Sequence, residues 1–293
     1  MFPAAFQYHR ARSTTEALAL LAEHGGDARL LAGGQSLIPA MRYRLARPAV
    51  LIDINPIDEL SYIADDEGHL RIGALTRDYA IERSPVVASR YALMNDVSAV
   101  VADPVVRQMG TVVGSLCHSD PAGDWSVAAL ASRAEVVIRG PAGERVVSID
   151  DFLVDSFTTA VGEGEMALEA RFPAAGPRSS GAYAKIERKV GDFATAAAAA
   201  AVTLAADGTI AEAGIAIGAA GPKAMRVTAA ESLLRGAKPS AELIRAAADE
   251  ARKLADPSPD TRGSAEFKKD MAGVVVRRAL ARTFERLGMG ELR

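Results

Sequence analysis

The sequence predicts an α+β fold divided among two or three compact units. The chain of 293 residues is longer than one small hydrophobic core usually serves. Near the N-terminus a strand, a turn, a helix and a second strand follow one another, which is typical of a parallel βαβ unit. Farther on, pairs of strands flank turn signals, and three helical segments come after them. Because these strands and helices come in separate runs along the chain, they favour antiparallel sheets with the helices packed beside them.

The N-terminal part is predicted to begin with a helix. Ser13–Glu16 forms a capping box, in which the serine oxygen and the glutamate bind free amides of the first turn, and Gly25-Gly26 ends this helix. Arg29–Ala32 and Val50–Ile54 are short apolar runs of strand type. Because Leu37–Leu45 between them has apolar residues at helical spacing, the two strands are expected to run parallel.

Two hairpins are predicted in the middle of the chain. Asp65–Gly68 and Gly140–Gly143 are turn segments, and apolar runs of strand length flank each of them. Helices are expected near residues 78–83 and 122–131. The four strands are expected at Leu60–Ala64, Leu70–Ala74, Glu135–Arg139 and Arg145–Ile149.

The C-terminal part is predicted to combine one more hairpin with helices. Phe172–Tyr183 is rich in Pro, Gly and Ser and is expected to be a linker. Asp207-Gly208 is a strong hairpin signal, which favours strands over Val202–Ala205 and Ile210–Ile217. Ala196–Ala201 leads into the first of these strands, so we expect it to be extended although alanine prefers helices. The helices are expected from Thr228, with Glu231 as its capping-box partner, to Gly236, at residues 240–255 and at 264–287.

Composition and charge exclude several classes of function. The net charge of -3 lacks the basic excess of nucleic-acid-binding proteins, and no apolar run is long enough for a membrane span. The single cysteine, Cys117, cannot form an intrachain disulfide or supply a four-thiolate iron–sulfur cluster. The histidines show no metal-ligand spacing, so we expect no metal site. Redox chemistry would need an organic cofactor or a partner, and without a secretion signal the expected location is the cytoplasm.

Two glycine-containing segments are candidate binding loops. Ala32–Leu37 reads AGGQSL, where the glycines permit close backbone approach and Ser36 can cap the next helix, whose amino end attracts anions. A tight turn explains this segment equally well, and the fingerprints GxGxxG and GxxxxGK[ST] are absent from the chain. The second loop, Gly110–Ser115, offers two glycines and two small hydroxyls, and Asp120-Pro121 after it is typical of a helix start. A dinucleotide needs donors from more than one side, which a pair of such loops supplies.

Four segments together resemble the FAD-binding medium subunit of molybdenum hydroxylases, a family that includes aerobic carbon monoxide dehydrogenases and relatives of xanthine dehydrogenase. They read AGGQSLIPAMRYRLARP, GTVVGSLCHSDPAGD, GAYAKIERKVGDFATAA and TRGSAEFKKDMAGVVVRRAL, in the family's order and spacing over essentially the whole chain. The resemblance implies a two-part FAD-binding module of the vanillyl-alcohol-oxidase type, expected over residues 1–56 and 57–176. A CO dehydrogenase flavoprotein C-terminal domain is expected over residues 177–293.

The resemblance also implies which residues hold FAD. Asp120 and Asp124 fall on an acidic pair of the family, and because carboxylates repel a diphosphate, we expect them to bind ribityl or ribose hydroxyls or to cap a helix. Lys185 lies where a cation could favour negative charge on the reduced ring, the alternative being a solvated strand lysine. Phe193 lies where the family places an aromatic beside the isoalloxazine, the alternative being core packing. The other cofactor-binding residues are expected to be Ala32, Gly33, Gly34, Gln35, Ser36, Leu37, Gly110, Thr111, Val112, Val113, Gly114 and Ser115.

One position departs from the family pattern. The family usually has two glycines where this chain has Val113-Gly114. If the first of them requires positive φ, a valine there costs about 1–3 kcal/mol. Either the backbone at Val113 is ordinary or FAD affinity is lowered.

In this family, the resemblance implies, the chain itself carries no catalytic acid or base. A large subunit with the molybdenum cofactor oxidises the substrate, and a small iron–sulfur subunit passes electrons to FAD, which reduces an external acceptor. The expected assembly is a dimer of heterotrimers, in the cytoplasm or at the inner face of the membrane. Two alternatives stay open: a self-sufficient FAD-dependent oxidase or reductase, and a non-catalytic scaffold that lacks FAD.

Overall fold

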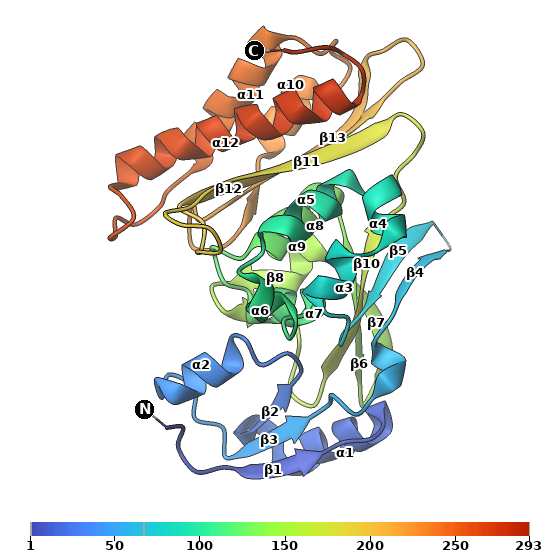
Figure 1. Cartoon of the computed structure of the whole chain (residues 1–293), viewed down its shortest axis with the longest axis vertical. Coiled ribbons are helices and arrows are strands. Elements are labelled where there is room, and N and C mark those ends of the chain that lie inside the picture. The colour runs from blue at the N-terminus through green and yellow to red at the C-terminus, as the bar shows by residue number, and fades with distance from the viewer. Residues whose placement is uncertain (1, 67, 293) are drawn as a thin grey trace.

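Three sheets follow one another along the long axis of the molecule, in the order of the sequence (Figure 1). The computed structural model describes residues 2–66 and 68–292. Within these residues, the strand order is β1-β3-β2 in the N-terminal sheet, β4-β5-β10-β6-β7 in the middle sheet and β11-β12-β13-β14 in the C-terminal sheet, beside a small β8-β9 pair. The predicted α+β fold class is confirmed.

The elements have the following bounds. The strands are β1 (Gln7–Arg10), β2 (Ala28–Leu31), β3 (Val50–Asp53), β4 (Ile63–Asp66), β5 (His69–Gly73), β6 (Glu135–Gly140), β7 (Gly143–Ser148), β8 (Leu153–Asp155), β9 (Thr158–Thr159), β10 (Met166–Pro173), β11 (Ser179–Ile186), β12 (Ala196–Leu204), β13 (Ile210–Gly218) and β14 (Met225–Arg226). The helices are α1 (Thr14–His24), α2 (Leu37–Arg42), α3 (Asp78–Glu82), α4 (Pro85–Arg90), α5 (Ala92–Val100), α6 (Pro104–Arg107), α7 (Val112–His118), α8 (Asp124–Ser132), α9 (Ile149–Phe152), α10 (Thr228–Leu234), α11 (Ala241–Leu254) and α12 (Ala265–Arg286), with short 3-10 turns at Gly25–Asp27 and Asp58–Leu60.

The N-terminal sheet confirms the predicted parallel strands and adds one more. β2 and β3 run parallel, and β1 joins the other side of β3, also in parallel. The start and end of α1 are as predicted, because the Ser13 hydroxyl accepts a hydrogen bond from the N–H of Glu16, and Gly25 ends the helix with a φ of 52°. β1 escapes prediction because its sequence, QYHR, has no apolar alternation and is mostly exposed.

Both predicted hairpins of the middle sheet are present, but β10 lies between them. β4 pairs with β5 and β6 with β7, each antiparallel, while the predicted turn residue Glu67 lies outside the described residues. β10 pairs with β5 on one side and β6 on the other. The predicted linker is therefore too long. Phe172 is a buried strand residue, and only residues 174–178 connect β10 to β11.

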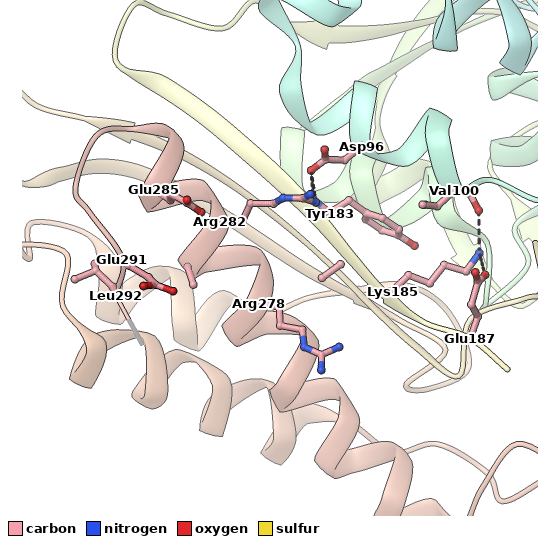
Figure 2. Close-up of a pocket in the computed structure, with 12 residues that line it drawn as sticks. Asp96, Val100, Tyr183, Lys185, Glu187, Arg278, Arg282, Glu285, Glu291 and Leu292 are labelled. Atoms are coloured by element: carbon pink, nitrogen blue, oxygen red, sulfur yellow. Dashed lines mark hydrogen bonds and ion pairs between the residues drawn. The ribbon is translucent and has the colours of Figure 1, made fainter. Parts of the chain in front are cut away.

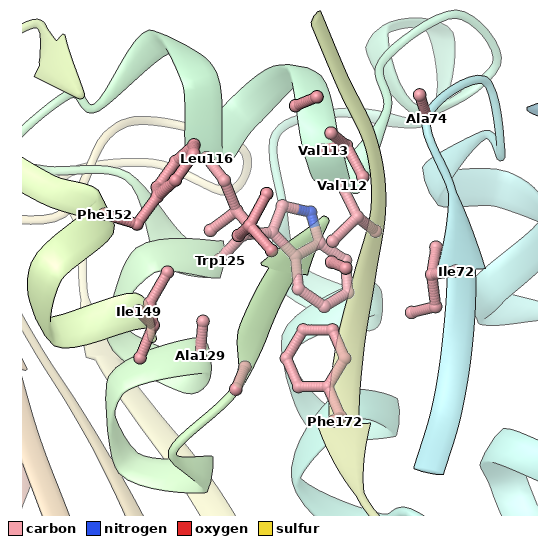
Figure 3. Packing of buried hydrophobic residues seen from close by; sticks show 14 of the residues in the cluster. Ile72, Ala74, Val112, Val113, Leu116, Trp125, Ala129, Ile149, Phe152 and Phe172 are labelled. Atoms are coloured by element: carbon pink, nitrogen blue, oxygen red, sulfur yellow. The ribbon is translucent and has the colours of Figure 1, made fainter. Parts of the chain in front are cut away.

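Large side chains fill the space between the middle sheet and helices α7, α8 and α9 (Figure 3). Trp125, Phe152 and Phe172 are fully buried there. The indole Nε1 of Trp125 donates a hydrogen bond of 2.9 Å to Asp78 Oδ1, so its polar atom is satisfied inside the core. This packing fixes α7 and α8 on the sheet and thereby positions the loops that precede them.

The alanine run lies in β12, as predicted, and faces two cores. All of Ala196–Ala201 pairs with β11 and most of it also with β13. Ala197 and Ala199 belong to the core that continues into the middle of the molecule, whereas the even-numbered alanines belong to a second core under α10, α11 and α12. Methyl side chains let α8 pack on one face of the sheet and α12 on the other. This tertiary packing overrides the helical propensity of alanine.

The three C-terminal helices lie near their predicted positions. α11 and α12 begin with side-chain caps, Ser240 and Ser264. The start of α10 is different, because Val227 occupies its N-cap position without a side-chain hydrogen bond. The predicted capping role of Glu231 is therefore wrong. Its buried carboxylate instead binds the guanidinium of Arg226, and burial of an acid requires such a partner.

Candidate functional site: a glycine-lined cradle

The two predicted loops are in direct contact at Gly33. A Cβ built on Gly33 would lie 2.1 Å from the carbonyl oxygen of Met109 and 3.0 Å from Cα of Gly110. Since these are backbone atoms, no side-chain rotation could relieve the overlap. The structure thus brings Ala32–Leu37 and Gly110–Ser115 together, and only glycine at position 33 allows it.

Two side chains that the sequence analysis does not single out hold this junction. Arg77 donates one hydrogen bond of 2.7 Å to the carbonyl oxygen of Met109 and another of 2.6 Å to Asn55 Oδ1. Asn55 Nδ2 in turn donates to the carbonyl oxygen of Ala32 at 2.9 Å. These bonds connect the first loop to the second. The signal in the sequence is slight: Asn55 follows the predicted strand Val50–Ile54 and precedes a proline, and Arg77 precedes a short helix.

The first loop presents unpaired backbone donors. Among the described residues, the N–H groups of Gly33, Gly34, Gln35 and Ser36 have no hydrogen-bond acceptor. Gly34 has a φ of 71°, which favours glycine. Ser36 occupies the N-cap position of α2, but its hydroxyl makes no capping hydrogen bond, so the predicted capping role is wrong. The loop and the first turn of α2, starting at Leu37, are suited to an anionic ligand.

The second loop contains the start of a regular helix, α7. The Thr111 hydroxyl caps α7 by accepting a hydrogen bond of 3.1 Å from the N–H of Gly114. Val112 and Val113 are the first helical residues, so their N–H groups have no partner within the helix. Ser115 continues the same turn, with its N–H bonded to the carbonyl oxygen of Thr111. The free N–H groups of Gly33–Ser36 and those of Val112 and Val113 thus come from two segments that meet at Gly33. We name this pair of segments, Ala32–Leu37 and Gly110–Ser115, the cradle.

The valine that departs from the family pattern is not strained. Val113 lies in the first turn of α7 and is absent from the residues with positive φ. Its side chain is buried against the core together with that of Val112 (Figure 3). Of the two explanations that the sequence leaves open, the ordinary backbone is confirmed. A side chain at position 113 points away from the amide-lined surface and contributes to stability.

Asp120 does not start the following helix. Its Oδ1 accepts a hydrogen bond of 2.9 Å from the N–H of Ala122, which closes a local turn. α8 begins four residues later at Asp124, with Gly123 as its N-cap. The predicted N-cap at Asp120 is therefore wrong by several residues, because Pro121 lies in a tight turn that the N–H of Gly123 closes on the carbonyl oxygen of Asp120 before the helix begins.

Asp124 and Lys185 form a buried ion pair at the junction of α8 and β11. Lys185 Nζ lies 3.2 Å from Asp124 Oδ2. It also lies 3.2 Å from Glu187 Oε2 and donates to the carbonyl oxygen of Val100 at 3.3 Å (Figure 2). The hydroxyl of Tyr183 donates to Asp124 Oδ1 at 2.5 Å. Only 4% of the Lys185 side chain is exposed, so the alternative of a solvated lysine is wrong.

Burial dominates the electrostatics of this network. Removal from water raises the pKa of Asp124 even though Lys185 and Tyr183 stabilise its charge. The same burial, together with Asp124, raises the pKa of Tyr183 well above its ordinary value. The charge of Lys185 is already balanced by two carboxylates. A cavity of about 550 Å³ between β11, α5 and α12 opens beside the network.

Phe193 lies on an exposed loop between β11 and β12. Its side chain is 53% exposed, so the alternative of core packing is wrong. Asp192 shapes the loop by accepting a hydrogen bond from the N–H of Phe193 and by pairing with Arg262 at 2.9 Å. A Cβ on Gly191 would lie 3.2 Å from backbone atoms of Ala102, so the loop rests on the segment that leads through α6 to the cradle. Phe193 is thus available for contact with a ligand.

Asp78 is buried against the second loop and carries a perturbed carboxyl group. Its N–H donates to the carbonyl oxygen of Gly110 at 2.9 Å, and its Oδ1 accepts from Trp125. Burial raises the pKa of Asp78 from 3.8 to about 7, although the hydrogen bond from Trp125 opposes the shift. Because the folded-state pKa exceeds the unfolded one, this group stabilises the protein below pH 4. That contribution is lost as the pH rises through about 7.

Asp78→Asn is therefore expected to stabilise the protein at alkaline pH. Asparagine keeps an acceptor for Trp125 and carries no charge that must be buried. The pKa difference sets a ceiling of about 4 kcal/mol, and we expect a gain of about 1–3 kcal/mol at pH 8.5 that shrinks on acidification towards pH 5. Urea unfolding at several pH values measures it, with the exposed Asp58→Asn as control. A gain that is constant across this pH range would contradict the assignment.

Comparisons with known proteins identify the two domains of the chain. Residues 4–175 match the family described as FAD binding domain in molybdopterin dehydrogenase, and residues 181–283 match the CO dehydrogenase flavoprotein C-terminal domain. The fold and these two matches thus define an FAD-binding flavoprotein.

Relatives extend over nearly the whole chain. The carbon monoxide dehydrogenase medium chain of Hydrogenophaga pseudoflava is 40% identical over 96% of this chain and 97% of its own length. The 6-hydroxypseudooxynicotine dehydrogenase complex subunit alpha of Paenarthrobacter nicotinovorans is 35% identical over 98% and 97%. A solved carbon monoxide dehydrogenase of H. pseudoflava, which lacks the Mo-pyranopterin moiety of its cofactor, superimposes with a TM-score of 0.95 at 40% identity over 98% of this chain and 99% of that one. The chain belongs to the FAD-binding medium subunits of the molybdenum hydroxylase family.

Among its described residues no helix has the length and hydropathy that a membrane span needs.

Proposed function

We propose that this protein is the electron-transfer subunit of a molybdenum hydroxylase complex. In the proposed complex, a small subunit carries iron–sulfur clusters, a large subunit carries the molybdenum cofactor and oxidises the substrate, and an external acceptor takes the electrons. The full-length similarity to a carbon monoxide dehydrogenase medium chain supports this division of labour. So does the single cysteine, which cannot ligate a cluster within this chain.

The observation that carries the proposal is the cradle at Gly33. Two segments with free N–H groups meet there without intervening side chains, which is the chemistry that a diphosphate requires. We propose that FAD is held by Ala32–Leu37 and Gly110–Ser115, with Asp120 available to a ribityl or ribose hydroxyl and Phe193 against the ring. FAD, when bound, supplies a carrier that connects single-electron donors with two-electron acceptors.

Asp124 and Lys185 are proposed as positioning residues. Their ion pair is buried and already balanced by Glu187, so it holds β11 against α8 instead of presenting a bare charge. The strand leads directly into the loop that bears Phe193. Through this connection the pair sets where the aromatic side chain lies relative to the cradle.

The substrate of the complex is set by another subunit in this proposal. The two relatives described above belong to a carbon monoxide dehydrogenase and to a dehydrogenase complex for 6-hydroxypseudooxynicotine, two chemically unrelated substrates. Chains that share this fold at such similar identity therefore serve different substrates. In the proposed complex, this chain contributes cofactor binding and electron transfer and leaves the choice of substrate to another subunit.

Purification through a tag on this chain from its source cells tests the proposal. We expect oxidised-flavin absorption bands, FAD released on denaturation, and two co-purified subunits: a small one with iron and acid-labile sulfide, and a larger one with molybdenum. Two results would reject the proposal. One is a protein that stays colourless after incubation with FAD. The other is turnover of an electron donor by the isolated chain without partners.

A further inference from the structure

Asn55 and Arg77 form a series of hydrogen bonds that ends on the backbone of the cradle. Asn55 follows β3, and its Nδ2 donates a hydrogen bond of 2.9 Å to the carbonyl oxygen of Ala32. Its Oδ1 accepts a hydrogen bond of 2.6 Å from Arg77, the residue before α3. The guanidinium of Arg77 is thus connected through one amide side chain to the first loop.

The amide group of Asn55 is held on both sides. The carboxylate of Asp53 accepts hydrogen bonds from the backbone N–H of Asn55 at 3.0 Å and from its Nδ2 at 2.6 Å. On the other side, the guanidinium of Arg77 can only donate, so it fixes the position of Oδ1. The side chain therefore has one orientation, with its donor directed at Ala32.

This orientation also fixes the next N–H group of the backbone. The carbonyl and the N–H of a trans peptide point in opposite directions, and the described residues contain no cis peptide. Because the carbonyl oxygen of Ala32 is directed at Asn55, the N–H of Gly33 is directed away from Asn55. That N–H has no acceptor among the described residues and is one of the free donors of the first loop.

Arg77 also holds the second loop, at the atom against which Gly33 packs. It donates a hydrogen bond of 2.7 Å to the carbonyl oxygen of Met109, and a Cβ on Gly33 would lie 2.1 Å from that oxygen. One guanidinium therefore fixes the position of the second loop and, through Asn55, the orientation of a peptide in the first. A planar group with several donors in a fixed arrangement can reach both acceptors at once.

The positive charge of Arg77 is not neutralised by an ion pair with any residue that the structure describes. Burial lowers the pKa of its guanidinium, although the carboxylates of Asp78 and Asp53 oppose this shift. Since arginine stays protonated in proteins, a half-buried cation lies beside a loop with free N–H groups. Both features favour an anion at this point of the molecule.

We propose that Asn55 and Arg77 are positioning residues for the diphosphate of FAD. They hold the carbonyl of Ala32 away from the ligand, so that the N–H of Gly33 donates to a phosphate oxygen. The inference rests on the proposed function, in which the cradle binds FAD. Neither side chain needs to contact the cofactor, because both act through the backbone. A donor that is already oriented needs little rearrangement when the ligand binds, which raises the affinity.

Asn55→Ala tests this role in the full chain. Fluorescence titration of the deflavinated protein with FAD is expected to show about tenfold weaker binding, the effect of one misplaced hydrogen bond to a charged group. The phosphorus NMR resonances of bound FAD at saturation are expected to shift, which a loss of stability alone would not cause. Asn95→Ala removes the other asparagine of the chain, which lies on α5, and should change neither reading.

Arg77→Met is a second variant, which decides the question if Asn55→Ala does not fold. We expect about tenfold weaker binding of FAD, whereas Arg235→Met removes the same charge at an exposed position after α10 and should have no effect. Arg77→Lys keeps the charge but loses the planar arrangement of donors, so its affinity should lie closer to that of Arg77→Met than to that of the wild type. An affinity closer to the wild type would show that charge alone matters and would overturn the positioning role.

The double variant Asn55→Ala, Arg77→Met shows whether the two residues act in series. Two independent tenfold losses would multiply to about a hundredfold, whereas residues of one hydrogen-bond network are not additive. We expect the double variant to lose clearly less than the product of the two single effects. A loss equal to that product would overturn the inference.

The outcomes separate this inference from the proposed function. If the wild-type chain binds no FAD, the proposed function fails. If it binds FAD, and Asn55→Ala and Arg77→Met match their controls, only the positioning role is overturned. If these variants bind FAD more weakly but leave its phosphorus spectrum unchanged, the two residues merely tether the loops, and the inference is overturned as well.

Discussion

Gly33→Ala is expected to leave the purified protein with little FAD. The added methyl group would lie 2.1 Å from the carbonyl oxygen of Met109, and its other near neighbours, the Met109 carbonyl carbon and Gly110 Cα, are also backbone atoms. The two segments of the cradle must then separate. Overpacking of this kind costs about 1–3 kcal/mol, so we expect FAD affinity to fall by about tenfold to a hundredfold. Fluorescence titration of the deflavinated protein with FAD gives the dissociation constant.

Gly26→Ala is the matched control for this variant. It makes the same chemical change only seven residues earlier, at a glycine without positive φ, where a Cβ meets nothing within 4 Å. It should bind FAD like the wild type. Near-ultraviolet circular dichroism then shows whether the core of the position 33 variant is intact. Unchanged FAD affinity in a folded Gly33→Ala protein would remove the cradle from the proposed binding site.

Lys185→Met is expected to destabilise the protein by about 3–5 kcal/mol near neutral pH, because it leaves buried carboxylates without their cation. Asp124 and Glu187 each lie 3.2 Å from the ammonium group. Burial already raises the pKa of Asp124 in the wild type, and loss of Lys185 raises it further. A carboxyl group whose folded pKa is raised stabilises the protein below its unfolded pKa and ceases to do so as the pH rises. The deficit should therefore shrink on acidification.

Two comparisons make this prediction specific. Lys253→Met removes an exposed lysine that pairs with Glu250, and such a surface pair contributes about 1 kcal/mol or less. The double variant Asp124→Asn, Lys185→Met should recover part of the loss, since it removes one of the unpaired charges as well. Free energies of unfolding from urea titrations at several pH values measure all three. If Lys185→Met lowered the free energy of unfolding no more than Lys253→Met does, the buried ion pair would not stabilise the contact between β11 and α8.

The sequence predicts the first helix start and the hairpins well, because the signal for each is local. Ser13 caps α1 as predicted, and the last two helices begin after Ser240 and Ser264, where they were expected to start. The hairpins around Asp65–Gly68 and Asp207-Gly208 also form as predicted, with Glu67 outside the described residues. These features depend on residues a few positions apart, which a single sequence displays.

What the sequence does not predict depends on contacts across the chain. β10 reaches the centre of the middle sheet because distant β5 and β6 both pair with it, while the proline and glycine that follow it obscure its end. Arg77 and Asn55 become part of the cradle only when two loops are brought together, and neither belongs to a recognisable motif. Whether Lys185 is buried or solvated is decided by its neighbours on α5 and α8, which lie about 60 to 85 residues away in sequence. Burial of that kind is a tertiary property.

The methyl-lined strand β12 has a consequence for how this protein could be rearranged in evolution. Its odd-numbered alanines complete the interior that begins at the N-terminus, and its even-numbered ones complete the interior under the last helices. Both faces of this single strand are therefore buried, each in a different hydrophobic core. If the part of the chain on either side of β12 were separated from the other, one apolar face of the strand would be exposed to water. We therefore expect the two parts to be inherited together.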